Sequence, residues 1–349
     1  MDAQLSVSSK PRVDWVDAVK GLTIILVVMK HTTYGTEAAL HHVPYVFNLL
    51  CEWTIPFRMP LFFLVAGLFA RKALFAPLPA FLDSKILHFA YFYLLWSFIQ
   101  IGIKIVVPHE AIWHVSYMDI LMIPLEPFGL LWFVYALAIF FTLMRLARNV
   151  PPVIMVALAL GLYFTRLNTG WTLPDEFAGR FIFFVCGTYA APYIFAMASW
   201  AEDKQWQSMA IGSGLLALVA GMVYLGIVDW RIAELFAGAI GAAGTIMLVA
   251  LLAANGYARP LTFVGSRSLY VFLAFFLPMA AARILLVKFG VTNGDLITLI
   301  SLFTAVTGPL VAYEISKQVA VLRFFFERPT AFRLSNKDMA SRETIAATP

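Results

Sequence analysis

Long apolar runs, each about as long as a membrane-crossing helix and ended by charged residues, proline or glycine, occupy most of this sequence. A helix needs about 20 apolar residues to cross a bilayer. Ten such runs lie near residues 15–34, 57–75, 86–107, 129–148, 151–165, 177–199, 208–228, 232–254, 268–288 and 295–317. Because 61% of the residues are hydrophobic, 13% are charged and the mean hydropathy is +0.83, no large soluble domain fits beside them. The sequence predicts an all-α, polytopic membrane helix bundle of about ten transmembrane helices.

The basic residues predict how these spans are oriented. Positively charged loops are retained in the cytoplasm, and with the N-terminus inside, sixteen Lys and Arg residues fall on the cytoplasmic side and five outside. Both termini are therefore expected in the cytoplasm, with residues 1–12 as a tail, 13–329 as the membrane domain and 330–349 as a disordered tail. The net charge of +5 is assigned to these loops, and no nucleic-acid partner is expected. The outer segments 35–56 and 108–128 are expected to be long connections that cover a site.

The cysteine content limits the chemistry. Cys51 and Cys186 both lie in apolar stretches, and two cysteines cannot build a metal cluster or a disulfide framework. We therefore expect no metal ion, and look for function in the polar side chains inside the apolar runs.

The first run carries three such side chains, Asp17, Lys20 and His31. The eleven residues from Lys20 to His31 turn a helix by about 1100°, close to three whole turns, so all three side chains share one face. Ionisable groups are costly in hydrocarbon unless they are paired or face a cavity. One interpretation is an Asp17–Lys20 ion pair at the membrane edge, with His31 meeting water at the outer end. The other is that His31 acts as a general base towards a hydroxyl.

The second run adds further cations. Pro56 and Pro60 are expected to break or offset its helix, and Gly67 to permit close helix approach. Arg58 enters from outside, opposite His31, where it is either an interfacial snorkelling arginine or part of a site. Arg71 and Lys72 close the run on the cytoplasmic side, as a phosphate-binding pair or as plain positive-inside anchors.

Several motifs, taken in order, resemble the membrane-bound acyltransferase family 3, and most closely its fucose 4-O-acetylase-like branch. They are D-A-V-K-G-L-T-I-I-L-V-V-M-K-H at 17–31, M-P-L-F-F-L-V-A-G at 59–67, L-L-W-F-V-Y-A-L at 130–137, F-F-V-C-G at 183–187, V-G-S-R-S-L-Y-V at 264–271 and R-F-F-F-E-R-P at 323–329. Asp17, Lys20 and His31 match the branch's pattern of Asp, a base three residues on, and His after ten intervening residues.

The resemblance implies ten core spans in the cell inner membrane. It also implies transfer of an acyl group, usually acetyl, from cytoplasmic acyl-CoA to a hydroxyl of a sugar, glycan or glycolipid acceptor. His31 occupies the position of the family's essential histidine, and Lys20 that of its basic partner. Asp17 is expected to hold the Lys20 side chain in place. Three positions depart from the family pattern: Arg58 and Phe275 stand where many relatives have His, and Ala66 where they have Ser. No hydrolase-like domain of the kind fused to some relatives is expected after the last span, so an extracytoplasmic partner protein is one expectation.

These residues suggest one working hypothesis. Acyl-CoA docks from the cytoplasm with its phosphates near Arg71 and Lys72, and its thioester reaches His31. Arg58 is the first candidate to stabilise the oxyanion. Trp132, which is assigned to acyl-CoA binding, is a weaker candidate through its indole N–H. The alternative is a transporter or carrier of a lipid-linked sugar or small polar solute, which would not consume acyl-CoA.

Overall fold

The computed structural model describes residues 13–106, 117–127 and 129–334, and this part of the chain is helical without strands. The first half contains α1 (Asp14–Leu40), α2 (Tyr45–Gly67), α3 (Ala70–Leu74), α4 (Leu78–Phe81), a π-helical segment (Leu82–Leu87), α5 (His88–Val106), α6 (Tyr117–Met122), α7 (Trp132–Leu146) and α8 (Pro152–Phe164). The second half contains α9 (Thr172–Tyr189), α10 (Ala191–Asp203), α11 (Gln205–Tyr224), α12 (Arg231–Ala254), α13 (Arg259–Gly265), α14 (Ser268–Ala274), α15 (Phe276–Lys288), α16 (Gly294–Gln318) and α17 (Ala320–Arg323). Helices suit these runs because every backbone polar group is bonded within its own segment, as a bilayer requires.

The helices confirm a multi-pass membrane architecture. Among the described residues, six helices are long and apolar enough to cross a membrane, and two bent pairs raise the number to eight if each pair is one span. Two predicted runs are neither among these six helices nor in the bent pairs. The first corresponds to α1, which has 27 residues but carries several charges, and the fifth corresponds to α8, which has 13 residues. The total of ten spans, the orientation of the termini and the predicted domain bounds stay predictions. The predicted tails 1–12 and 335–349 lie outside the described residues.

The prediction for the second run was wrong in its bounds. Residues 35–56 are not a long connection, because α1 extends to Leu40, α2 begins at Tyr45, and only four residues separate the two helices. Pro56 and Pro60 lie inside α2 and do not end it. A buried helix tolerates internal proline when its neighbours pack closely around it, and Gly238 of α12 lies directly against the carbonyl of Pro56. Of the other expected connection, 108–128, residues 117–122 form α6, whereas 108–116 lie outside the described part.

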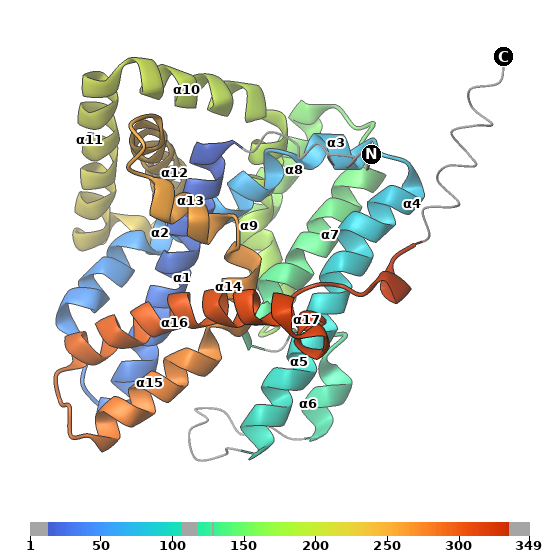
Figure 1. Cartoon of the computed structure of the whole chain (residues 1–349). Coiled ribbons are helices and arrows are strands. Elements are labelled where there is room, and N and C mark those ends of the chain that lie inside the picture. Colours follow the sequence, from blue (N-terminus) through green and yellow to red (C-terminus); the bar gives the residue numbers. More distant parts are fainter. Residues whose placement is uncertain (1–12, 107–116, 128, 335–349) are drawn as a thin grey trace, which may run out of the picture.

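Two predicted spans are bent. The axes of α9 and α10 differ by 74° at Ala190, and those of α14 and α15 differ by 53° at Phe275. Figure 1 shows α10 running across the ends of α11 and α12, both of which it contacts. The other bend lies at Phe275, where α14 meets α15. This bend leaves Phe275 beside α1.

α1 lies in the middle of the bundle, where it packs against α2, α12, α13 and α16 (Figure 1). Glycines set the closest crossings. Gly265 of α13 lies against the backbone of Asp17, and Gly187 of α9 against the backbone of Leu64. Gly67 packs on the backbone of α9 at Phe184, which confirms its expected role in close approach. The sequence motifs at 17–31, 59–67, 183–187 and 264–271 thus meet in pairs at these crossings.

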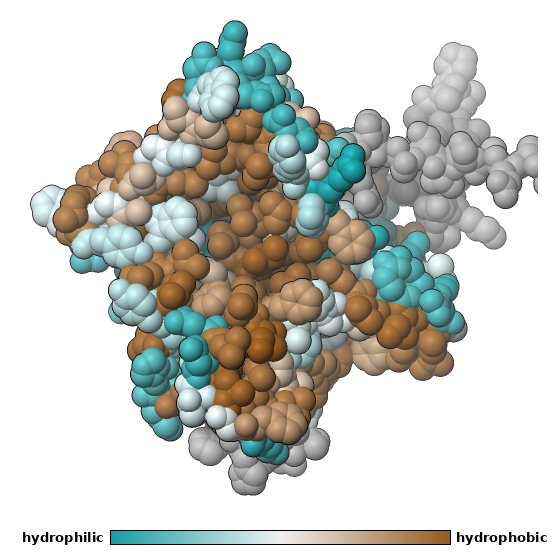
Figure 2. All heavy atoms as spheres, turned by 60° about the vertical axis from the view of Figure 1, so that its left-hand side comes forward, coloured by the Kyte–Doolittle hydropathy of each residue, from teal (hydrophilic) through white to brown (hydrophobic). Residues whose placement is uncertain are grey.

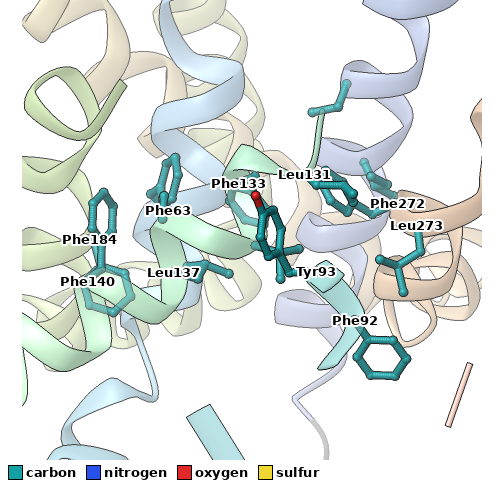
Figure 3. Packing of buried hydrophobic residues seen from close by; sticks show 14 of the residues in the cluster. Phe63, Phe92, Tyr93, Leu131, Phe133, Leu137, Phe140, Phe184, Phe272 and Leu273 are labelled. Carbon is teal, nitrogen blue, oxygen red and sulfur yellow. The ribbon is translucent and has the colours of Figure 1, made fainter. Parts of the chain in front are cut away.

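An aromatic core fills the space between α2, α7, α9 and α14. Phe63 lies 5.0 Å from Phe140, and Phe133 lies 5.5 Å from Phe272, measured between ring centroids (Figure 3). The outside is apolar as well: Figure 2 shows a broad hydrophobic surface across the middle of this face, with hydrophilic residues at the top, on the right and at the lower left. Exposed Trp206 and Tyr257 flank one end of α11 and α12, and exposed Trp230 the other. Amphipathic rings at both ends of apolar helices are typical of the two membrane interfaces.

Candidate active site

His31 is half-buried on α1 and faces the break between α14 and α15. Its ring centroid lies 5.9 Å from that of Phe275, which is fully buried. Phe275 is one of the three positions at which the sequence departs from the expected pattern of the family it resembles. The departure at this position therefore places an apolar ring directly beside the candidate base.

Arg58 of α2 is the buried cation beside His31. Only 4% of it is exposed, and both Arg58 and Lys30 are close enough to act electrostatically on the His31 ring. The Nη1 group of Arg58 donates a hydrogen bond of 3.2 Å to Thr54 Oγ1, one turn earlier on α2. Within the described residues no carboxylate forms an ion pair with Arg58, so guanidinium N–H donors are left for another acceptor. Arg58 of α2 and His31 of α1 thus lie within electrostatic range of each other, and the predicted shared role of the two residues stays a prediction.

Two further groups from α9 complete this region. Arg180 Nε lies 3.1 Å from Glu176 Oε2, and both residues act electrostatically on Lys30. The Lys30 ammonium also lies 5.4 Å from the ring centroid of Tyr34. Sequence reasoning assigned no role to Lys30 or Glu176. The available signal was a glutamate four residues before an arginine at the start of an apolar run.

Asp17 and Lys20 form an ion pair of 3.1 Å between Asp17 Oδ1 and Lys20 Nζ, in agreement with the expectation that Asp17 holds Lys20. Asp17 is buried and Lys20 half-buried. Eleven residues of helix separate Lys20 from His31, or about 16 Å along the axis. The structure thus joins Asp17 to Lys20 and leaves the pair far from the His31 ring.

The remaining predicted site residues lie elsewhere. Arg71 and Lys72 are exposed on the short helix α3. Trp132 begins α7 and packs on the aromatic core, 6.0 Å from Phe63. Arg71, Lys72 and Trp132 are all absent from the linings of the two cavities described next.

One cavity of about 420 Å³ lies at the C-terminal end of α1, beginning one turn beyond His31 at Tyr34. It is also lined by Glu37, Ala38, His41, His42 and Val43. A second cavity of about 600 Å³ lies between the start of α5, the start of α14 and the segment after α17. Its lining comprises Asp83, Ser84, His88, Phe92, Ser266, Arg267, Leu269, Tyr270, Phe326, Glu327, Arg328 and Arg333.

The arrangement suits proton transfer combined with anion stabilisation. A neutral imidazole can accept a proton from a hydroxyl, and a buried guanidinium can donate hydrogen bonds to an oxyanion. In the described part of the chain, no cluster of three or more His, Cys, Asp or Glu residues is placed to hold a metal ion.

Comparison with known proteins yields one match. The model of a family described as an acyltransferase domain, the acyltransferase family 3, matches residues 13–314. No curated protein matches this chain, and neither does any solved structure.

Proposed function

Because the chain belongs to the acyltransferase family 3, we propose that it is an acyl-CoA-dependent O-acyltransferase of the cell inner membrane, with His31 as general base. The donor is acyl-CoA, with acetyl as the expected acyl group, and the acceptor is a hydroxyl of a sugar, glycan or glycolipid. The observation that carries this proposal is the pairing of half-buried His31 with buried Arg58, whose guanidinium has no carboxylate partner in the described structure.

The residues divide the reaction between them. His31 takes the proton as the acceptor oxygen attacks the thioester carbonyl, and the carbon–oxygen bond forms. Arg58 donates hydrogen bonds to the tetrahedral oxyanion. The carbon–sulfur bond then breaks, and protonated His31 returns the proton to the departing CoA thiolate, so that the products are an ester and CoA–SH.

The cavity at the outer end of α1 supports a polyhydroxylated acceptor. Glu37, His41 and His42 offer both hydrogen-bond donors and acceptors beside the ring of Tyr34. This cavity begins one helical turn from His31, so an acceptor held there has a short path to the base. Donor and acceptor then approach His31 from opposite sides of the membrane. An extracytoplasmic partner protein that presents the acceptor belongs to this proposal.

The test is transfer of label from radiolabelled acetyl-CoA in inside-out membrane vesicles. Intact protein is compared with His31→Ala and with His31→Gln, which keeps a polar side chain but cannot take the proton. Both variants are expected to lose transfer by about a hundredfold or more, at matched expression and with unchanged thermal unfolding.

Two results would contradict the proposal. Turnover retained by both variants would remove His31 from the mechanism. Movement of a lipid-linked sugar or small solute without consumption of acyl-CoA would instead favour the carrier class.

A further inference from the structure

We infer that the second cavity, at the start of α14, holds the phosphate groups of the acyl-CoA donor; this inference rests on the proposed function. Three arginines, Arg267, Arg328 and Arg333, line this cavity. All three belong to the set of basic residues that the distribution of Lys and Arg assigns to the cytoplasmic side. Guanidinium groups favour phosphate because their planar N–H donors match phosphate oxygens in pairs.

Arg328 is the most buried of the three, with 7% exposure. Its Nη2 lies 2.7 Å from Asp83 Oδ2, and its Nη1 donates to the carbonyl of Asp83 at 2.8 Å. The Nε of Arg328 is buried and has no hydrogen-bond partner in the described part of the chain. Asp83 therefore holds Arg328 in place and leaves one donor unused, which is costly unless a ligand accepts from it.

Arg267 is held by an ion pair with Glu314 and by hydrogen bonds from Nη1 to Ser266 and to the carbonyl of Phe263. Its Nη1 donates to Ser266 Oγ at 3.1 Å, but its buried Nε makes no hydrogen bond among the described residues. That Nε lies 3.5 Å from Oε1 of Glu314, a carboxylate whose other oxygen is 2.8 Å from Lys317 Nζ. Glu314 is thus shared between two cations, and Arg267 keeps positive charge available at the cavity.

Arg333 is exposed, and its Nη2 donates to the carbonyl of Arg328 at 3.2 Å. This bond ties the segment after α17 to the cavity without neutralising the Arg333 charge. Asp83 and Glu327 contribute two negative charges to the lining against three arginines, which leaves a net charge of +1 before a ligand binds.

An aromatic wall completes the cavity. The Tyr270 ring is stacked on that of Tyr313 with centroids 3.9 Å apart, and it meets Phe326 edge-on at 5.8 Å. Aromatic faces beside basic side chains are the usual surroundings of a nucleotide, because the base stacks while the phosphates are paired. The adenine and phosphates of a CoA molecule have this combination of groups.

Helix α14 connects this cavity to the candidate active site. Tyr270 lines the cavity, whereas Phe275, which directly follows α14, lies against His31. Five residues of helix rise separate Tyr270 from Phe275, or about 7.5 Å. The extended pantetheine arm of CoA is longer than this rise. A donor anchored by its phosphates in the cavity therefore brings its thioester towards His31.

The experiment measures equilibrium binding of radiolabelled CoA, which carries no acyl group, to the full chain in phosphatidylcholine nanodiscs. Arg267→Gln and Arg333→Gln are each expected to weaken CoA binding about tenfold, the worth of one charge-assisted hydrogen bond. Arg267→Lys is expected to recover part of the affinity. Arg148→Gln, which removes an exposed cation outside both cavities, is the matched control and leaves binding unchanged. Arg333 is exposed, so its substitution does not endanger folding.

Three other outcomes would overturn the inference. If Arg71→Gln with Lys72→Gln abolishes CoA binding and the cavity variants bind normally, the phosphates lie at α3 and the proposed acyl-CoA dependence stands. If the cavity variants lose binding of phosphatidylglycerol in mixed nanodiscs but keep that of CoA, the cavity holds a lipid headgroup. If the intact chain binds no CoA, both the inference and the acyl-CoA part of the proposed function fail.

Discussion

Arg58 and His31 lie 27 positions apart in the sequence, on different helices, and the packing of α1 against α2 makes them neighbours. Arg58 is almost fully buried, yet the side chain that accepts a hydrogen bond from it among the described residues is the neutral hydroxyl of Thr54. A buried cation of this kind is costly to keep unless it serves an anion during function. At the scale of single residues, the burial of Arg58 is therefore the observation that best supports the proposal of a reaction in which negative charge develops.

Arg58→Ala is expected to lower kcat by about 10²–10³, the usual cost of losing an oxyanion donor. Arg58→Lys keeps the charge but loses the planar donor geometry, so its kcat is expected to lie between that of the intact protein and that of Arg58→Ala. Both are read from steady-state acetyl transfer at varied acetyl-CoA concentration. A change confined to KM would instead make Arg58 a substrate-binding residue.

At the scale of helices, three glycines allow the backbones of α1, α2, α9 and α13 to touch. A Cβ at Gly265 would overlap the carbonyl oxygen of Asp17, and a Cβ at Gly187 would overlap that of Leu64. Small residues of this kind are how membrane helices reach close contact, since lipid supplies little hydrophobic driving force between them.

Gly265→Ala and Gly187→Ala are therefore expected to destabilise the bundle by about 2 kcal/mol or more, because backbone atoms must move apart. The matched control is Gly214→Ala on α11, where a Cβ meets nothing within 4 Å. That change is expected to be neutral or stabilising by up to about 1 kcal/mol. Thermal unfolding in detergent measures all three, and equal transition temperatures would refute the close crossings.

The end of α3 depends on one arginine from α7. Arg145 Nη1 donates to the carbonyls of Leu74 and Ala76 at 3.0 and 2.9 Å, and its guanidinium lies 4.5 Å from the ring centroid of Phe81. Carbonyls at a helix C-terminus have no partner within the helix, so a cation there satisfies them.

Arg145→Ala is expected to cost about 2 kcal/mol of stability and to expose the connection between α3 and α4 to protease. Limited proteolysis of the purified chain checks this, with Arg148→Ala as the neighbouring control. Equal cleavage of the two variants would show that Arg145 does not hold this connection.

At the scale of the whole molecule, the apolar surface and the aromatic residues at both ends of α11 and α12 identify a chain that crosses the membrane repeatedly (Figure 2). The two cavities lie apart from each other, one beside Tyr34 of α1 and the other beside Tyr270 of α14. The proposed reaction requires these ends to open on opposite sides of the membrane.

Cysteine labelling tests this two-sided access in a Cys51→Ser, Cys186→Ser background. His42→Cys is expected to react with an impermeant maleimide only in right-side-out vesicles, and Lys72→Cys only in inside-out vesicles, since both positions are exposed. Reaction of both from the same side would contradict the predicted orientation and the separate approach of donor and acceptor.

The sequence by itself determined the features that depend on local chemistry. Apolar runs predicted the helices, because a backbone in lipid must satisfy its own hydrogen bonds. The spacing of Asp17 and Lys20 predicted one shared face, and the ion pair follows from it. Gly67 predicted close approach because it has no side chain.

Only the tertiary structure decided which helices are neighbours. It bent two runs at Ala190 and Phe275, brought Arg180 of α9 towards Lys30 of α1, and placed Phe275 against His31. It also gathered three arginines from two distant segments around one cavity. None of these contacts is encoded in a local pattern, because each depends on how glycine crossings and aromatic packing fix one helix against another across hundreds of residues.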